Sequence, residues 1–143
     1  MSPRYTSSLL GGLLSLGLPL AACGSKEPAA ALEPTLEAIQ AQVFEPSCAM
    51  TGCHSALDSA GEVDLSTADA SYASLVDVPA TNAAARAVQS MRVKPGDPER
   101  SFLRRKMDRP GPDEGDAMPP GAPPLEAQHR AAITEWIAGG ARR

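Results

Sequence analysis

The sequence has few aromatic residues. Phe, Trp and Tyr make up 3% of its 143 residues, and after the amino-terminal apolar segment they are Phe44, Tyr72, Phe102 and Trp136. Proline and glycine are common by contrast, with 14 and 12 residues. A core made from these side chains alone would be thin. A large, flat and apolar cofactor would supply the missing core, so the composition favours a fold that forms around such a group.

The chain also lacks an excess of basic residues. It has 13 Lys and Arg against 17 Asp and Glu, a net charge of −4. This balance argues against a nucleic-acid partner, because proteins that bind nucleic acids carry a basic stripe. A Gly-rich phosphate loop and a Ser-His-Asp arrangement are missing too, so we do not expect an enzyme. We expect a monomer.

No apolar run is long enough to remain as a membrane-spanning helix. After Arg4, the run from Leu9 to Leu20 has about a dozen residues, whereas crossing about 30 Å of hydrocarbon needs about 20. The run predicts a signal peptide over residues 1–22. Its ending, Leu20-Ala21-Ala22-Cys23, resembles the lipobox of bacterial lipoproteins, in which the cysteine is acylated. An ordinary secretory signal with a coincidental cysteine is the alternative.

Acylation of Cys23 would anchor the protein to a membrane of the cell envelope. Gly24 follows where an aspartate would favour the inner membrane, so we expect the outer membrane and a protein that faces the periplasm. Residues 23–34 are mostly Ala, Pro, Glu, Lys and Ser and predict a flexible tether. Residues 35–143 then form one domain.

Apolar periodicity in this domain indicates helices and no convincing strands. The pattern predicts helices over 36–44, which Pro46 ends, over 68–76 and over 125–138. A further helix starts with Asp97 as N-cap and Pro98 as its first residue, and carries Phe102, Leu103 and Met107 on one stripe. The expected architecture is all-α, with four short helices and long loops.

The motif with the most chemistry is Cys48-Ala49-Met50-Thr51-Gly52-Cys53-His54. Two thiols can add to the vinyl groups of a porphyrin while the adjacent histidine ligates the iron, although the usual spacing is Cys-x-x-Cys-His. Residues five apart lie about 140° apart around a helix, so residues 49–52 must bulge, and Gly52 gives the freedom to do so. The same bulge permits a Cys48–Cys53 disulfide. Zinc held by Cys48, Cys53, His54 and His129 is a third possibility.

A second candidate ligand lies in residues 108–124, which include six prolines and three glycines. Read alone, this segment is a linker, but a long irregular stretch inside a domain is uncommon unless it is functional. Met118 offers a soft thioether that suits haem iron, and Pro119 would fix its backbone. His129, expected at the surface, is the next candidate for this position.

The remaining methionines and cations receive weaker assignments. Met50 is too close to its own cysteines to reach the iron, and we expect Met91 and Met107 in the core or at the surface. Lys94, Arg104 and Arg105 are candidate partners of haem propionates. For the two arginines, a solvated helix face is the preferred interpretation.

In this order the motifs resemble the small c-type cytochrome domain of bacterial lipoproteins, including its Cys-x4-Cys-His variant. Besides Cys48, Cys53 and His54, the matching pieces are Gly61 with Asp64-Leu65-Ser66, Tyr72 with Leu75-Val76, Val93-Lys94-Pro95-Gly96-Asp97-Pro98 with Ser101 and Leu103, Met118-Pro119-Pro120-Gly121, Pro124-Leu125, and Trp136-Ile137 with Gly140-Ala141. One departure is Glu126, where a Ser or Thr cap is expected.

The resemblance implies a cytochrome c-like fold around one covalent haem c. It implies attachment through Cys48 and Cys53, with His54 as the proximal and Met118 as the distal ligand. The expected function is electron transfer to or from a redox partner that the sequence does not identify. The alternative is a haem-free interaction or structural lipoprotein that keeps this scaffold with a Cys48–Cys53 disulfide.

Overall fold

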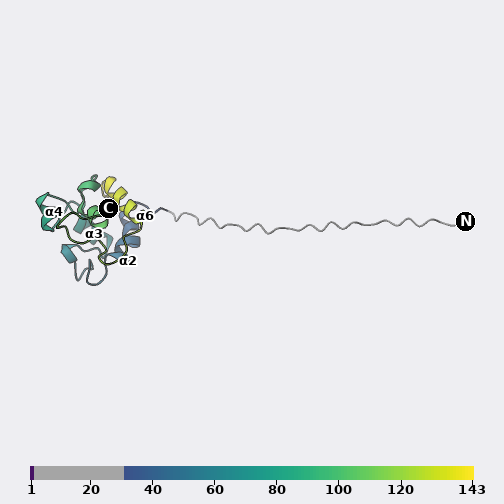
Figure 1. Cartoon of the computed structure of the whole chain (residues 1–143), viewed down its shortest axis with the longest axis horizontal. Coiled ribbons are helices and arrows are strands. Elements are labelled where there is room, and N and C mark those ends of the chain that lie inside the picture. Colours follow the sequence, from purple (N-terminus) through teal and green to yellow (C-terminus); the bar gives the residue numbers. More distant parts are fainter. Residues whose placement is uncertain (2–30) are drawn as a thin grey trace.

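The computed structural model of the chain describes residue 1 and residues 31–143 (Figure 1). The predicted signal peptide, Cys23 and the tether as far as residue 30 lie outside these residues. Residues 31–143 form short helices joined by long loops, and their only β-type pairings are isolated bridges. This part of the chain is therefore helix-rich and without strands, in agreement with the predicted all-α class.

The first helical segment leads directly to the cysteine motif. It consists of α1 (Leu36–Ile39), a π-helical stretch (Gln40–Phe44) and α2 (Glu45–Ser47), which follow one another without a break. The Thr35 hydroxyl caps it by accepting from the Ala38 amide at 3.2 Å. Pro46 lies in the first turn of α2, where proline is tolerated, so the helix runs past the predicted end at 44. It stops at Ser47, and Cys48 follows.

The middle of the domain contains one predicted helix and one that the sequence analysis missed. A 3₁₀ turn (Ala60–Glu62) is followed by α3 (Ala68–Leu75), which Thr67 caps, close to the predicted span of 68–76. The unpredicted helix is α4 (Ala83–Ala87), which the Asn82 side chain caps by accepting from the Ala85 amide. Its sequence, Ala-Ala-Ala-Arg-Ala, has no apolar periodicity that could have indicated it.

The helix predicted from Asp97 onward is divided into two. Asp97 accepts from the Arg100 amide at 3.1 Å as expected, but this cap starts only a 3₁₀ turn (Pro98–Arg100). Ser101 is extended, and its hydroxyl accepts from the Lys94 amide at 2.8 Å. Helix α5 (Phe102–Met107) begins after it. Ser101 closes the 3₁₀ turn, since its amide donates to the Pro98 carbonyl and its hydroxyl to the Asp97 carbonyl, but its extended backbone separates this turn from α5.

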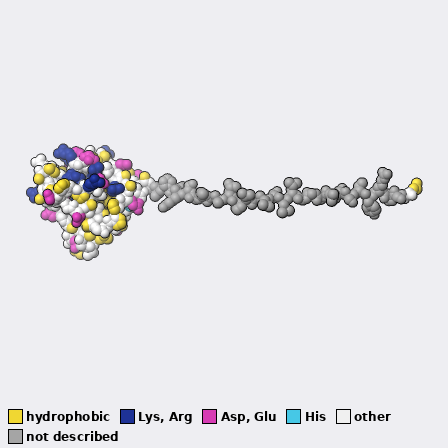
Figure 2. Space-filling model, in the orientation of Figure 1, with side chains coloured by type: hydrophobic (Ala, Val, Ile, Leu, Met, Phe, Trp, Pro, Cys, Tyr) yellow, Lys and Arg dark blue, Asp and Glu magenta, His cyan; other side chains and the backbone are white. Residues whose placement is uncertain are grey.

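The terminal helices meet in the core. Helix α6 (Ala127–Ala138) contacts α1, and the fully buried Ile39 and Ile133 come from these two helices. Glu126 precedes α6 without capping it through its side chain, as anticipated. Leu32 is 8% exposed and belongs to the same core, so the folded domain already includes this residue of the predicted tether. Figure 2 shows acidic side chains scattered among the Lys and Arg side chains of this face.

Candidate cofactor site

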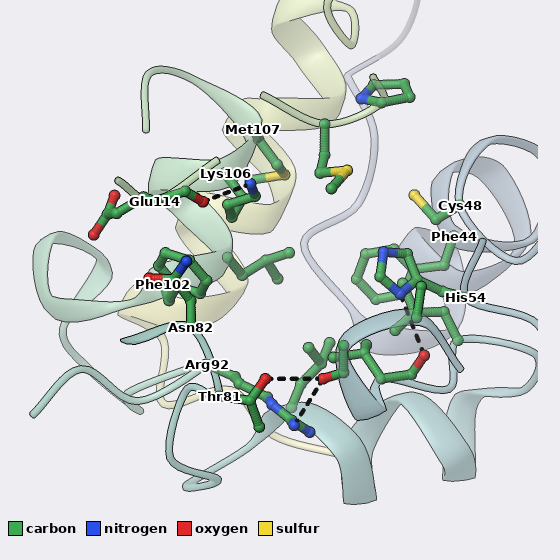
Figure 3. A pocket seen from close by; sticks show the side chains of 18 of the residues that line it. Phe44, Cys48, His54, Thr81, Asn82, Arg92, Phe102, Lys106, Met107 and Glu114 are labelled. Atoms are coloured by element: carbon green, nitrogen blue, oxygen red, sulfur yellow. Dashed lines mark hydrogen bonds between the residues drawn. The ribbon is translucent and has the colours of Figure 1, made fainter. Parts of the chain in front are cut away.

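The domain contains a cavity of about 390 Å³ with largely apolar walls. Its volume falls within the range of about 300–1,000 Å³ that is typical of ligand sites. Three of the four predicted site residues line it: Cys48, His54 and Met118. Figure 3 shows Phe44, Cys48 and His54 on one side, with Phe102, Lys106 and Met107 on the other. Cys53 is half-buried in the same motif but is not part of the lining.

The cysteine motif forms the irregular turn that its spacing requires. Gly52 has a φ of +80°, and its amide donates to Asp58 Oδ2 at 2.9 Å. The Cys53 amide donates to the Met50 carbonyl at 2.9 Å, and the His54 amide donates to the Cys48 carbonyl at 3.1 Å. These bonds turn the chain back on itself between the two cysteines. The predicted bulge at 49–52 is confirmed.

The His54 ring is held by one backbone oxygen. Its Nδ1 lies 3.3 Å from the Val63 carbonyl oxygen, and the His54 carbonyl accepts from the Leu65 amide at 2.8 Å. A carbonyl can only accept a hydrogen bond, so this contact places the proton on Nδ1 and leaves the Nε2 lone pair free. Metal-binding histidines are oriented in the same way.

Both cysteines are free thiols and half-buried. Burial, with a smaller contribution from Cys53, raises the pKa of Cys48 to about 11, so its thiol is protonated at neutral pH. No group of three or more His, Cys, Asp and Glu side chains in the described part of the chain is placed to hold a metal ion. The zinc alternative with Cys48, Cys53, His54 and His129 therefore has no site there.

Met118 enters the cavity from residues 108–124, which we call the distal loop. The Met118 amide donates to the Lys106 carbonyl of α5 at 2.7 Å. Arg105 does not lie on a solvated helix face as predicted, because its guanidinium binds the buried Glu114 of the distal loop at 2.9 Å. Arg104 fits the prediction better, since it pairs with the exposed Glu99 at 3.2 Å.

Most of the lining was not foreseen, and Arg92 and Met107 are two of the unforeseen residues. Arg92 is 6% exposed, and its guanidinium donates to the carbonyls of Gly61, Glu62 and Ser74 at 2.8–3.1 Å. Burial lowers the pKa of Arg92, and the negative charge of Glu62 partly offsets this decrease. Met107, expected only in the core or at the surface, belongs to the core and also lines the cavity, so a second thioether is present. An isolated Arg or Met carries no motif that could have marked either residue.

Several weaker candidates lie elsewhere. Lys94, Arg104, Arg105, Met50, Met91 and His129 are not part of the lining. The cation of α5 that lines the cavity is Lys106. The acidic Glu114 of the distal loop lines it as well. The cavity therefore combines an apolar interior with a few charged residues, Arg92, Lys106 and Glu114, in its wall.

No protein-family model, no curated protein and no solved structure matches this chain. None of the helices within residues 31–143 is long and apolar enough to cross a membrane.

Proposed function

We propose that this protein is a c-type cytochrome with a cytochrome c-like fold, and that it transfers electrons through one covalently bound haem. The observation that carries the proposal is the meeting of Cys48, His54 and Met118 in one apolar cavity. Met118 is far in the sequence from the motif that carries Cys48 and His54. A thiol, an imidazole and a thioether are the groups needed to attach a haem and to ligate its iron on both sides.

The residues present fit this group. His54 directs Nδ1 to the Val63 carbonyl and keeps Nε2 for the iron, while Met118 provides a neutral sulfur ligand. When bound, the haem supplies a one-electron Fe(III)/Fe(II) couple. The largely apolar walls would favour Fe(II), because the reduced iron carries one positive charge fewer. If His54 and Met118 both ligate the iron, no coordination position would be left for a substrate, so we propose electron transfer and not catalysis.

Attachment is proposed through both cysteines. Cys48 is supported directly, since it lines the cavity, and Cys53 is supported by its place in the motif. Among the cations, Arg92 and Lys106 line the cavity and are the better candidates to face the propionates than Lys94, Arg104 or Arg105. These assignments replace the pairings expected from the sequence.

The experiment that tests the proposal is maturation in a host whose haem-attachment system tolerates the longer spacing. The haem should stay with the polypeptide through denaturation and give a c-type pyridine haemochrome. A properly matured protein without a Soret band contradicts the proposal. If peptide mapping then finds a Cys48–Cys53 disulfide, the haem-free interaction or structural lipoprotein takes its place.

We further propose that acylation of Cys23 anchors the domain to a membrane, with the outer membrane expected from Gly24. Cys23→Ser should release the protein from washed membranes and leave the haem spectrum unchanged, because residues 23–31 separate Cys23 from the folded domain. Cell fractionation with immunoblotting measures the release. A Cys23→Ser variant that remains in salt-washed membranes would contradict the anchor.

A further inference from the structure

The distal loop is held to the rest of the domain by a small set of polar contacts around Glu114. The Glu114 carboxylate is 8% exposed and accepts from two nitrogens of Arg105, from Nε at 3.2 and 3.3 Å and from Nη2 at 2.9 Å. It also accepts from the Gly111 amide at 2.7 Å. Arg105 Nη2 is itself fixed by Ser90 Oγ at 2.8 Å. The carboxylate therefore connects the distal loop to α5 through Arg105. It also connects two positions within the loop, Glu114 and Gly111.

Lys106, next along α5, holds the part of the loop that carries Met118. Its Nζ donates to the Glu114 carbonyl at 3.0 Å (Figure 3) and to the Asp116 carbonyl. Its own carbonyl accepts from the Met118 amide. One residue thus binds the loop on the approach to Met118 and at Met118 itself.

We propose that Arg105, Lys106 and Glu114, here called the loop clamp, are positioning residues that keep the Met118 thioether in the cavity. Only the statement that Met118 ligates iron rests on the proposed function. The distal loop contains no helix or strand, so few backbone bonds oppose its opening. Loss of one partner from a mostly buried ion pair leaves the other charge uncompensated. The loop should then open, and Met118 should leave the cavity with it.

Hydrogen exchange at the Met118 amide tests the clamp without any haem. Pro119 and Pro120 carry no amide hydrogen, so exchange in a peptide over residues 116–120 reports on few amides. One of them is the Met118 amide, which donates to the Lys106 carbonyl. In Arg105→Gln and Glu114→Gln, exchange in this peptide should be at least about tenfold faster. Unchanged exchange in both variants would overturn the proposal.

Two further variants separate the clamp from a general loss of stability. Arg104→Gln changes the neighbouring arginine, which pairs with the exposed Glu99, and should leave the peptide unaffected. Arg105→Lys keeps the charge but loses the two-pronged geometry, so it should restore part of the protection. Equal acceleration in Arg104→Gln would overturn a specific role for Arg105 and Glu114.

The haem-loaded protein gives the readout at Met118 itself. In Arg105→Gln and Glu114→Gln, the sulfur-to-iron charge-transfer band should weaken and carbon monoxide should bind more readily. Faster exchange with an unchanged band would overturn the positioning role, because the loop would then open without moving the ligand. If the wild-type protein proves to carry no haem, the proposed function fails, while the exchange experiment still decides whether the clamp holds Met118.

Discussion

The two sides of the cavity are built in different ways. On the side of the cavity that carries His54, the proposed proximal side, His54 is fixed by backbone groups of the same stretch of chain, at Cys48, Val63 and Leu65. On the distal side, Met118 depends on side chains of α5 that reach across to an irregular loop. Local turns can thus hold the cysteine motif and His54, whereas the distal loop needs a folded partner to hold Met118. The two sides should therefore respond differently to substitution.

The largest expected effect follows from removal of the proximal residues. Cys48→Ser and His54→Ala should each prevent stable haem incorporation, because one loses the thiol that lines the cavity and the other loses the proximal ligand. The Soret absorbance per polypeptide measures this. His129→Ala is the matched control, since His129 does not line the cavity. Full haem content in both variants, or loss in His129→Ala, would contradict the assigned site.

The next effect separates the two methionines of the cavity. Met118→Ala should abolish the sulfur-to-iron band, lower the reduction potential and open a position for carbon monoxide or cyanide, because a thioether favours Fe(II). Met107→Ala should keep the band, since Met107 lies on α5 within the core. The opposite result would make Met107 the ligand and reduce the distal loop to a lid.

The sequence predicted the proximal side better than the distal side. The cysteine motif and the bulge at 49–52 depend on local chemistry that a sequence displays directly. The Arg105–Glu114 pair depends on how the distal loop folds back, and no periodicity encodes this. The same limitation explains why Arg92 and Met107 were missed as lining residues: their place in the cavity is a property of packing. The cytochrome itself stays a prediction.

A smaller effect concerns acid. Burial raises the pKa of Glu114, but the hydrogen bonds from Arg105 and Gly111 and the charges of Arg105 and Lys106 outweigh it and hold the pKa below its usual value of 4.5. The ion pair therefore contributes fully above about pH 4.5 and is lost as the pH falls through the lower folded value. Hydrogen exchange at Met118, corrected for its intrinsic pH dependence, should rise below pH 4.5.

Two variants check the origin of this acid response. Glu114→Gln should abolish the rise in Met118 exchange at low pH, because the residue no longer titrates. Exchange should then be fast at every pH. Glu99→Gln, which removes an exposed partner of Arg104, should retain the step. An acid step that persists in Glu114→Gln would assign the response to another carboxylate.

The smallest effect compares one glycine from each side. Gly52 has a φ of +80° and Gly121 a φ of +68°, and a Cβ at either would meet open space. The cost of alanine is therefore backbone strain alone, about 1 kcal/mol of unfolding free energy at each position, measurable by urea denaturation. Only Gly52 lies between the two cysteines, so only Gly52→Ala should also slow haem attachment. Equal attachment in both variants would show that the turn tolerates strain, and the proximal side would then owe its geometry to the bonds of His54 and Cys53 instead of to the glycine.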